Sequence, residues 1–398
     1  MPAVPATPPP PRGTRPHNRR ALLLSAAADL FAENGYGNVS MKDVAAASNM
    51  SASSLYTHFA SKNELLYEVI ADQIDRSLSY IEDGSTAAPR STYALSEIAA
   101  GLTAGVLAHR SLGVLWQREA RSLDAAGRAE LRRRLTGFGA VVRDALLVQR
   151  PDMATDQAAL LTQCAFGAVT SISFHHQSLP RREFATLLSD LCLRMLLLEP
   201  AVATARYRAR RRPITPRSGG RRQELADAAI TLFARRGFSE VTIDDIGATV
   251  GIAGPSVYKH VKSKQELLQI AFDHSTAILR DALTRVERSS QAPTDAVRAV
   301  TDSYLALALD QADLITVLIG EAHHLDGEAQ RHARHVQREY IDAWAALIHR
   351  IRDEAPTVTR IKIQAAQMVA NDIGRTPHLH RVRGWRATVE NACWTLQQ

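Results

Sequence analysis

The chain repeats itself at an interval of 202 residues, so that Tyr56 is matched by Tyr258. At this interval the segments 23–66 and 225–268 align without a gap. The residues of the first copy with an identical partner include Leu23, Ala26, Ala27, Leu30, Phe31, Ala32, Gly35, Val39, Asp43, Ala46, Ser54, Tyr56, His58, Ser61, Lys62, Glu64, Leu65 and Leu66 and, further along, Glu119, Ala120, Leu123 and Asp124. We therefore expect the 398 residues to form two copies of one fold, each with its own core.

Apolar residues recur at helical spacing in both copies. Between Leu23 and Phe31 they occupy positions i, i+3, i+4, i+7 and i+8, which is one face of a helix. This helix is expected to end at Asn34-Gly35, because glycine adopts the left-handed conformation of a helix cap. No convincing strand pattern accompanies it, so the predicted fold class is all-α.

A short second helix follows in each copy. Ser40 and Thr242 each precede an aspartate by three residues, which is typical of a capping residue at a helix N-terminus. Asn49 and Gly251 then tolerate the positive φ of a tight turn between two helices. Such a turn leads into a third helix.

The third helix is predicted over 53–59 and 255–261, and a long fourth helix follows it. Ser61 and Ser263 open the fourth helix, each with a glutamate three residues later, as in a capping box. Two short helices joined by a tight turn and braced by a first helix make a helix-turn-helix head.

The repeat also predicts the domain organisation. The expected segments are a flexible basic arm 1–18, head 19–66, body 67–204, a basic linker 205–220, head 221–268 and body 269–398. The arginine-rich linker is either a solvated connector or an arm that follows phosphates, and composition leaves both open. Lys plus Arg number 48 against 41 Asp plus Glu, and this net charge of +7 favours polyanionic partners.

Other classes of protein are disfavoured by what the sequence lacks. Cys164, Cys192 and Cys393 are far apart, so we expect buried apolar thiols instead of a disulfide framework or zinc site. His332 and His335 have metal-ligand spacing but no accompanying ligands, and no metal or cofactor is predicted. We find no long apolar run, export signal or catalytic motif, and expect a cytoplasmic protein without membrane contact that is not an enzyme.

Both heads, 21–66 and 225–268, resemble the N-terminal domain of TetR-family transcriptional regulators. The resemblance rests on an ordered set found twice: the first-helix stripe, a Gly-aromatic pair, a hydroxyl cap, aromatic-x-His and Ser-Lys-x-Glu-Leu. It implies an all-helical fold with a three-helix head and a helical body that binds an effector. It also implies pairs of heads on duplex DNA, with each third helix in a major groove.

The resemblance assigns phosphate contacts to Tyr56, His58, Lys62, Tyr258, His260 and Lys264. A phenol, an imidazole and an ammonium group can all donate to phosphate oxygens, which sets the register without reading sequence. The alternative is that the tyrosines cover the small core of the head.

Base reading is expected on the first turns of the third helix. The candidates are Ala52, Ser53, Ser54 and Thr57 in the first head and Gly254, Pro255, Ser256 and Lys259 in the second. Lys42 and Thr242, at the second helices, are further DNA-binding candidates. Lys42 is replaced by Asp244, so the two heads are expected to prefer different half-sites.

The segment 112–135 resembles the effector domain of TetR-type regulators of actinobacterial lipid and sterol metabolism, and the doubled head is most similar to tandem repressors of lipid-import and lipid-metabolism operons. A small hydrophobic or acyl-type effector is implied. The candidate ligand residues are Trp116, Arg118, Arg121, Phe166 and Phe174. The alternative for the arginines, which we favour, is that they pair with glutamate and brace neighbouring helices.

We expect one chain to act as a pseudo-dimer, with a four-helix interface between about Asp156–Leu198 and Pro356–Gln398. The predicted function is an effector-released repressor on an asymmetric operator. Two chains on one operator, or a sensor with one degenerate head that serves only for pairing, are the alternatives.

Overall fold

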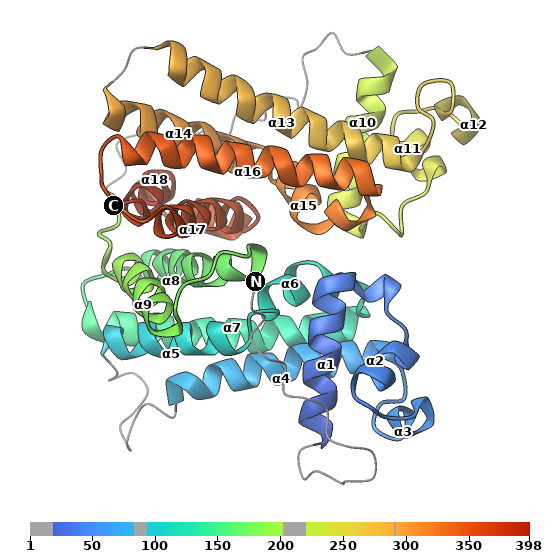
Figure 1. Ribbon diagram of the computed structural model, residues 1–398, viewed down its shortest axis with the longest axis horizontal. Coiled ribbons are helices and arrows are strands. Elements are labelled where there is room, and N and C mark those ends of the chain that lie inside the picture. The colour runs from blue at the N-terminus through green and yellow to red at the C-terminus, as the bar shows by residue number, and fades with distance from the viewer. Residues whose placement is uncertain (1–18, 83–93, 202–219, 290–291) are drawn as a thin grey trace.

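The computed structural model describes residues 19–82, 94–201, 220–289 and 292–398 (Figure 1). The regular elements in these ranges are all helices, which confirms the predicted fold class. The predicted arm 1–18 and all but the last residue of the predicted linker 205–220 lie outside the described residues.

The described residues of the first half form nine α-helices and three short 3-10 helices. They are α1 (Arg19–Asn34), η1 (Tyr36–Asn38), α2 (Met41–Ala47), α3 (Ala52–Tyr56), α4 (Lys62–Glu82), α5 (Leu95–Ala108), α6 (Leu112–Gln117), η3 (Glu119–Ser122), α7 (Ala125–Gln149), α8 (Thr155–Thr170), η4 (Ser171–Phe174) and α9 (Arg181–Leu197).

The second half repeats this order. Its helices are α10 (Gly220–Arg236), α11 (Ile243–Thr249), α12 (Gly254–Val257), α13 (Lys264–Arg288), α14 (Pro293–Asp310), α15 (Ala312–Gly320), η5 (Ala322–His324), α16 (Gly327–His349), α17 (Pro356–Gly374), η6 (Pro377–Arg381) and α18 (Trp385–Leu396).

The interval that aligns the heads also aligns the bodies. Asp124 and Asp326, one interval apart, are the N-cap residues of α7 and α16, and each accepts a hydrogen bond from the backbone three residues on. Glu119 and Glu321 are both buried just before them. The prediction that the duplicated unit extends beyond the head is therefore confirmed.

Local capping explains where the short helices of the heads begin. Ser40 and Thr242 are N-caps of α2 and α11 in complete capping boxes with Asp43 and Asp245. Asn49 has φ 52° and Gly251 φ 75°, the left-handed conformation predicted for the turn.

The third helices are shorter than predicted. Instead of 53–59 and 255–261, α3 ends at Tyr56 and α12 at Val257. The side chains of Phe59 and Val261, 1% and 2% exposed, are drawn into the head cores, and a tighter turn through residues 57–58 and 258–260 brings them there.

The fourth helices begin as predicted at Ser61 and Ser263, but the capping boxes differ in one detail. Each serine Oγ accepts from the backbone N–H of the glutamate three residues on. The carboxylates of Glu64 and Glu266 instead accept from Ala60 and Lys262, one residue before the serine. Backbone N–H groups on both sides of each capping serine therefore still have a hydrogen-bond acceptor.

The predicted boundary between head and body falls inside a continuous helix in both halves. α4 and α13 run through residues 66 and 268 without interruption. A head is therefore joined to its body by a rigid element that belongs to both.

The two bodies meet through α8 and α9 of the first half and α17 and α18 of the second (Figure 1). A Cβ atom at Gly167 would lie 3.0 Å from Cα of Val369, which is the equivalent residue one interval on. The pseudo-twofold axis of the repeat therefore passes through this contact, and the four-helix interface predicted from the sequence is formed within one chain.

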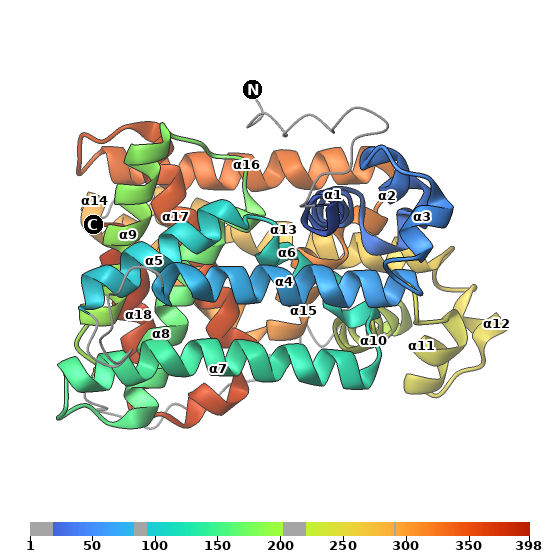
Figure 2. The same cartoon turned by 90° about the horizontal axis from the view of Figure 1, so that it is seen from below.

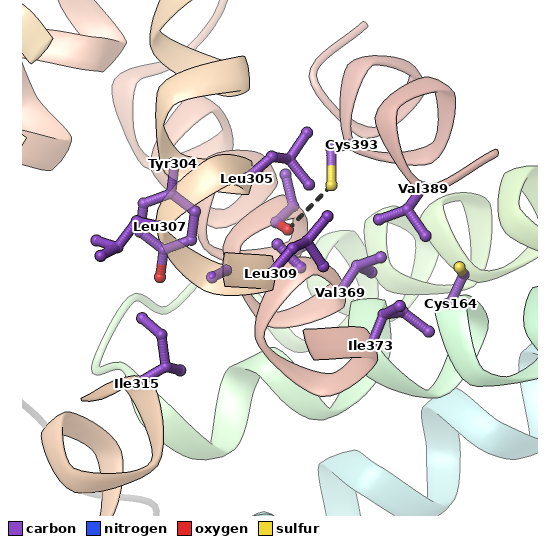
Figure 3. Close-up of a cluster of buried hydrophobic side chains, with 14 of the residues drawn as sticks. Cys164, Tyr304, Leu305, Leu307, Leu309, Ile315, Val369, Ile373, Val389 and Cys393 are labelled. Carbon is purple, nitrogen blue, oxygen red and sulfur yellow. Dashed lines mark hydrogen bonds between the residues drawn. The ribbon is translucent and has the colours of Figure 1, made fainter. Parts of the chain in front are cut away.

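The cysteines belong to the cores, as predicted. Cys164, Cys192 and Cys393 are free and buried. Figure 3 shows Cys164 on α8 facing Val369 and Ile373 of α17, with Val389 and Cys393 of α18 close by. Burial raises the pKa of the Cys164 thiol to about 12, which makes it an unreactive apolar side chain.

Within the described ranges, no single helix has the length and apolar character to cross a membrane. α14 and α15 meet that test only when they are joined across their 92° bend.

Candidate nucleic-acid interface

The two helix-turn-helix heads lie at the same end of the molecule. α2 and α3 of the first head and α11 and α12 of the second are at the right in both views (Figure 2). The bodies, with the interface between α8 and α17, extend away from this end. Both third helices are therefore presented in one direction by a single chain.

Each third helix is attached to its head by one face only. Leu55 and Val257 are fully buried. In contrast, Tyr56 is 54% and Tyr258 59% exposed, and both hydroxyl groups are available to a partner. The alternative that these tyrosines cover the head core has little support from such exposure.

The other predicted DNA-binding residues divide into two groups. Lys42, Ser53, Thr57, His58, Thr242, Pro255, Lys259 and His260 are exposed, whereas Ser54, Ser256, Lys62 and Lys264 are half-buried. The exposed residues of the first head lie on α2 and α3 and in the turn after α3, and those of the second head at the start of α11, on α12 and in the turn after it.

Some hydroxyl groups in this set are already engaged. Thr57 donates to the carbonyl oxygen of Ser54 at 2.7 Å. Thr242 is committed to the cap of α11, where its Oγ1 donates to Asp245 and accepts from the backbone of the same residue. Hydrogen bonds from the Thr242 backbone, Arg236 and the Thr242 side chain lower the pKa of Asp245 to about 2.

The two lysines predicted to contact phosphate lie over aromatic rings. Nζ of Lys62 is 4.2 Å from the ring centre of Tyr36, and Nζ of Lys264 is 4.3 Å from that of Phe238. Burial lowers the pKa of both ammonium groups.

Lys264 also donates to the carbonyl oxygens of Phe238 and Val241, at 2.7 and 2.8 Å. Its ammonium group therefore braces the loop between the first two helices of the second head. Two of the three donors of this ammonium group thus serve the backbone, and the third remains for the predicted phosphate contact, which stays a prediction.

The two heads differ at the start of the third helix. In the first head Ser51 caps α3 and accepts from the backbone of Ser54. In the second head the equivalent residue, Ala253, offers no side-chain cap. A carboxylate oxygen of Asp244 instead packs on Gly254, where it lies 1.6 Å from the position that a Cβ atom would occupy. The second head therefore carries a carboxylate directly beside α12, at the position where the first head has Lys42.

The predicted ligand residues Arg118 and Arg121 lie at the junction of head and body. Arg118 pairs with Glu119 and donates to the carbonyl oxygens of Phe31 and Ala32 at the end of α1. Arg121 pairs with Glu321 of the second half at 2.6 Å. Both guanidinium groups thus brace neighbouring elements, which is the arrangement that we favour from the sequence.

The remaining ligand candidates are distributed over the first body. Trp116 packs on the core shared by the first head and its body. Phe166 forms an edge-on contact with Phe138, with ring centres 5.3 Å apart. Phe174 lies against Gly113. The described contacts place Phe166 and Phe174 in different packing environments from the two arginines.

Sequence reasoning missed the Arg121–Glu321 pair and the Asp244–Gly254 contact. A signal for the first was available, because Glu119 and Glu321 are identical at the repeat interval while the residues before them, Arg118 and Gly320, differ. Among the described residues, no group of three or more His, Cys, Asp and Glu side chains is placed to hold a metal ion.

Comparison with known proteins assigns the heads. Residues 23–69 and 225–270 each match the family described as bacterial regulatory proteins, tetR family. The chain is 30% identical over 139 residues to the HTH-type transcriptional repressor KstR2 of Rhodococcus jostii (strain RHA1), covering 34% of this chain and 66% of that protein.

It is also 39% identical over 72 residues to the repressor of the same name in Mycolicibacterium smegmatis, covering 18% of this chain and 32% of that protein. The chain thus spans from about a third to about two thirds of these curated relatives. A solved TetR-family transcriptional regulator from Bordetella parapertussis 12822 is 25% identical, with a TM-score of 0.40 over 46% of this chain and 95% of that one.

The fold and the two exposed third helices define a tandem helix-turn-helix protein. More specifically, the chain belongs to the TetR family, and it carries two of the family's N-terminal domains on one polypeptide.

Proposed function

We propose that the protein is a sequence-specific DNA-binding regulator of transcription that acts as an effector-released repressor. The observation that carries this proposal is the exposure of two complete helix-turn-helix heads at one end of one chain. The naming of its curated relatives as repressors supports the direction of regulation.

Each head would hold DNA by its phosphates and read bases with the third helix. Tyr56, His58, Tyr258 and His260 are exposed donors beside α3 and α12, suited to phosphate oxygens. Ser53 and Thr57 would contact base edges in one half-site, and Pro255 and Lys259 would do so in the other. At a further equivalent position the first head has Lys42 and the second has Asp244. Unlike side chains at equivalent places favour an asymmetric operator.

One chain would be sufficient for two adjacent half-sites. The four-helix contact of α8, α9, α17 and α18 is the kind of interface that joins two subunits, and here it is formed within one polypeptide. Mass measurement of the complex with a minimal DNA site tests this, since two chains per site would contradict it.

The effector is proposed to be a small hydrophobic or acyl-type molecule, and the regulated genes to belong to lipid or sterol metabolism or transport. The support is the resemblance of segment 112–135 to regulators of that kind and the apolar side chains Phe166 and Phe174. An effector releases DNA only as far as it prefers a form whose heads are wrongly spaced. An anionic group that binds Arg118 or Arg121 would compete with Glu119 or Glu321 for the guanidinium group.

A second candidate is a sensor whose second head serves only for pairing. It is favoured by the uncapped, four-residue α12 and by the carboxylate of Asp244 in front of it. Footprinting separates the two candidates, because one active head protects a single half-site and two active heads protect a pair.

The decisive experiment is selection of binding sequences from random duplex DNA, followed by footprinting and titration at several salt concentrations. We expect two unlike half-sites, about one helical turn or a multiple of it apart. The logarithm of affinity should fall with the logarithm of salt by about 0.9 for each neutralised phosphate. Failure to enrich any sequence at low salt would refute the proposal.

A further inference from the structure

A buried ion pair joins the two halves of the chain close to the heads. Nη1 of Arg121 in η3 lies 2.6 Å from Oε1 of Glu321, which directly follows α15. Glu321 is 1% exposed. A carboxylate this deeply buried needs a cation, because desolvation of an unpaired charge costs several kcal/mol. The second half does not supply a basic side chain at 320, and the cation comes from the first half.

The reason lies in one difference between the copies. In the first half, the carboxylate of Glu119 forms an ion pair with Arg118 of the same half. The residue equivalent to Arg118 is Gly320. A Cβ atom at Gly320 would lie 2.5 Å from Nη2 of Arg121, so the guanidinium group occupies the space that a side chain would fill. The missing side chain of one half admits the arginine of the other.

The equivalent contact of the second half on the first half is made by a histidine and not by an arginine. His323 is the equivalent of Arg121, and its ring lies 3.4 Å from the Cβ position of Gly35 in the first head. Burial, together with His324, Arg118 and Arg121, lowers the pKa of His323 to about 3. A neutral imidazole can lie near Arg118, whereas a second arginine would be repelled.

Pairing of equivalent halves would lose this fit. In a pair of first halves, Arg121 would approach Arg118 instead of Gly320. In a pair of second halves, Glu321 would face His323 and Gly320 and have no cation. Like charges or an unpaired buried charge discriminate strongly against such a partner.

The two buried glutamates, Glu119 and Glu321, also connect this junction to both heads. Glu119 accepts from the backbone N–H of Tyr36 in the first head at 2.8 Å. In the second half, His324 lies 3.6 Å from Glu321 and stacks on Phe238 of the second head, with ring centres 4.7 Å apart. The junction thus touches the loop that follows the first helix of each head.

We propose that Arg121, Glu321 and Gly320 form a pairing determinant, which docks the first half of the chain on its second half and holds the two heads at one separation. The docking of the two halves does not depend on the proposed function. Its consequence for DNA binding rests on the proposed function.

The test measures the distance between the heads in the full chain without DNA. Spin labels on cysteines introduced at Glu33 and Arg235, exposed and equivalent residues of the two heads, report that distance by pulsed electron resonance. The native cysteines are buried and should not be labelled. The mass of each variant is measured in parallel by native mass spectrometry.

Arg121→Ala and Gly320→Arg should each broaden the distance distribution, and Gly320→Arg should shift part of the protein to open or two-chain particles. Gly137→Arg is the matched control, because Gly137 lies on α7 with nothing within 4 Å of its Cβ position. The double variant Gly320→Arg with Arg121→Ala distinguishes damage from lost pairing. The new arginine at 320 can form an ion pair with Glu321, as Arg118 does with Glu119. The thermal stability of the wild type should therefore return, while the distribution of distances between the heads stays broad.

A wild-type distribution in Arg121→Ala, equal effects of Gly320→Arg and Gly137→Arg, or a wild-type particle that pairs equivalent halves would overturn the proposal. Measurement of DNA binding by the same variants then distinguishes failure of the pairing determinant from failure of the proposed function. Arg121→Ala should bind two half-sites at altered spacing with less discrimination than the wild type. A broadened distance distribution in a protein that binds no DNA would sustain the pairing determinant and refute only the proposed function.

Discussion

Gly167 is the residue at which the contact between the two halves can be tested most directly. It lies inside α8, where replacement of glycine by alanine ordinarily stabilises a helix by about 0.8 to 1 kcal/mol. Here the added Cβ atom would meet Cα of Val369 at 3.0 Å and its backbone N at 3.3 Å. Backbone atoms cannot rotate away, so α8 and α17 must separate to admit a methyl group.

Overpacking of this kind costs about 1 to 3 kcal/mol. After the gain in helix propensity is subtracted, Gly167→Ala should lose up to about 2 kcal/mol of folding stability. Gly137→Ala, with open space around its Cβ position in the interior of α7, should instead gain up to about 1 kcal/mol. The two variants therefore differ in sign, although the chemical change is the same.

Urea denaturation of the full chain at one pH measures this difference, and hydrogen exchange of the α8 and α17 amides locates it. Under the proposed function, Gly167→Ala should also weaken binding to a duplex with two half-sites more than to a duplex with one. Stabilisation of Gly167→Ala to the same extent as Gly137→Ala would refute the close approach of the two helices.

Further predictions concern the heads and one buried histidine. Tyr56→Phe removes one exposed hydroxyl and should weaken binding to specific and scrambled duplexes equally, by roughly tenfold or more, in fluorescence anisotropy titrations; a loss confined to one sequence would contradict a phosphate contact. Lys259→Ala should relax base preference in one half-site only, as judged by footprints on sequence variants of that half-site. Lys264→Ala should destabilise the second head without DNA by about 2 to 3 kcal/mol, measured by hydrogen exchange, because two carbonyl oxygens lose a charged donor. Burial, with Arg110 and His176, lowers the pKa of His175 from 6.5 to about 3, so its contribution to stability is present above pH 6.5 and is lost as the pH falls below it. From pH 7 to pH 5 this loss is about 2 kcal/mol, and denaturation of His175→Asn at both values should show a correspondingly smaller change.

The parts of the fold that were predictable from the sequence depend on neighbours along the chain. Ser40 and Thr242 cap their helices through residues three positions on, and Asn49 and Gly251 supply the turn by their own backbone preference. Such interactions are complete within one or two helical turns, so the pattern of residues is sufficient to locate them.

The errors occur where a distant part of the chain decides. The predicted third helices were too long because Phe59 and Val261 enter the head cores. Nor could the sequence show that Lys264, predicted to contact phosphate from its residue type and place, also donates to the carbonyl oxygens of Phe238 and Val241, because only the folded head brings these atoms together.

By itself the sequence determined that the protein contains two helical units with helix-turn-helix heads, because a repeat and its helical periodicity are properties of residue order. The tertiary structure alone decided how the units face each other. Arg121 and Glu321 are distant in sequence, and whether a buried carboxylate finds its cation in its own half or in the other depends on the space left at Gly320. That space exists only after both halves have folded and packed.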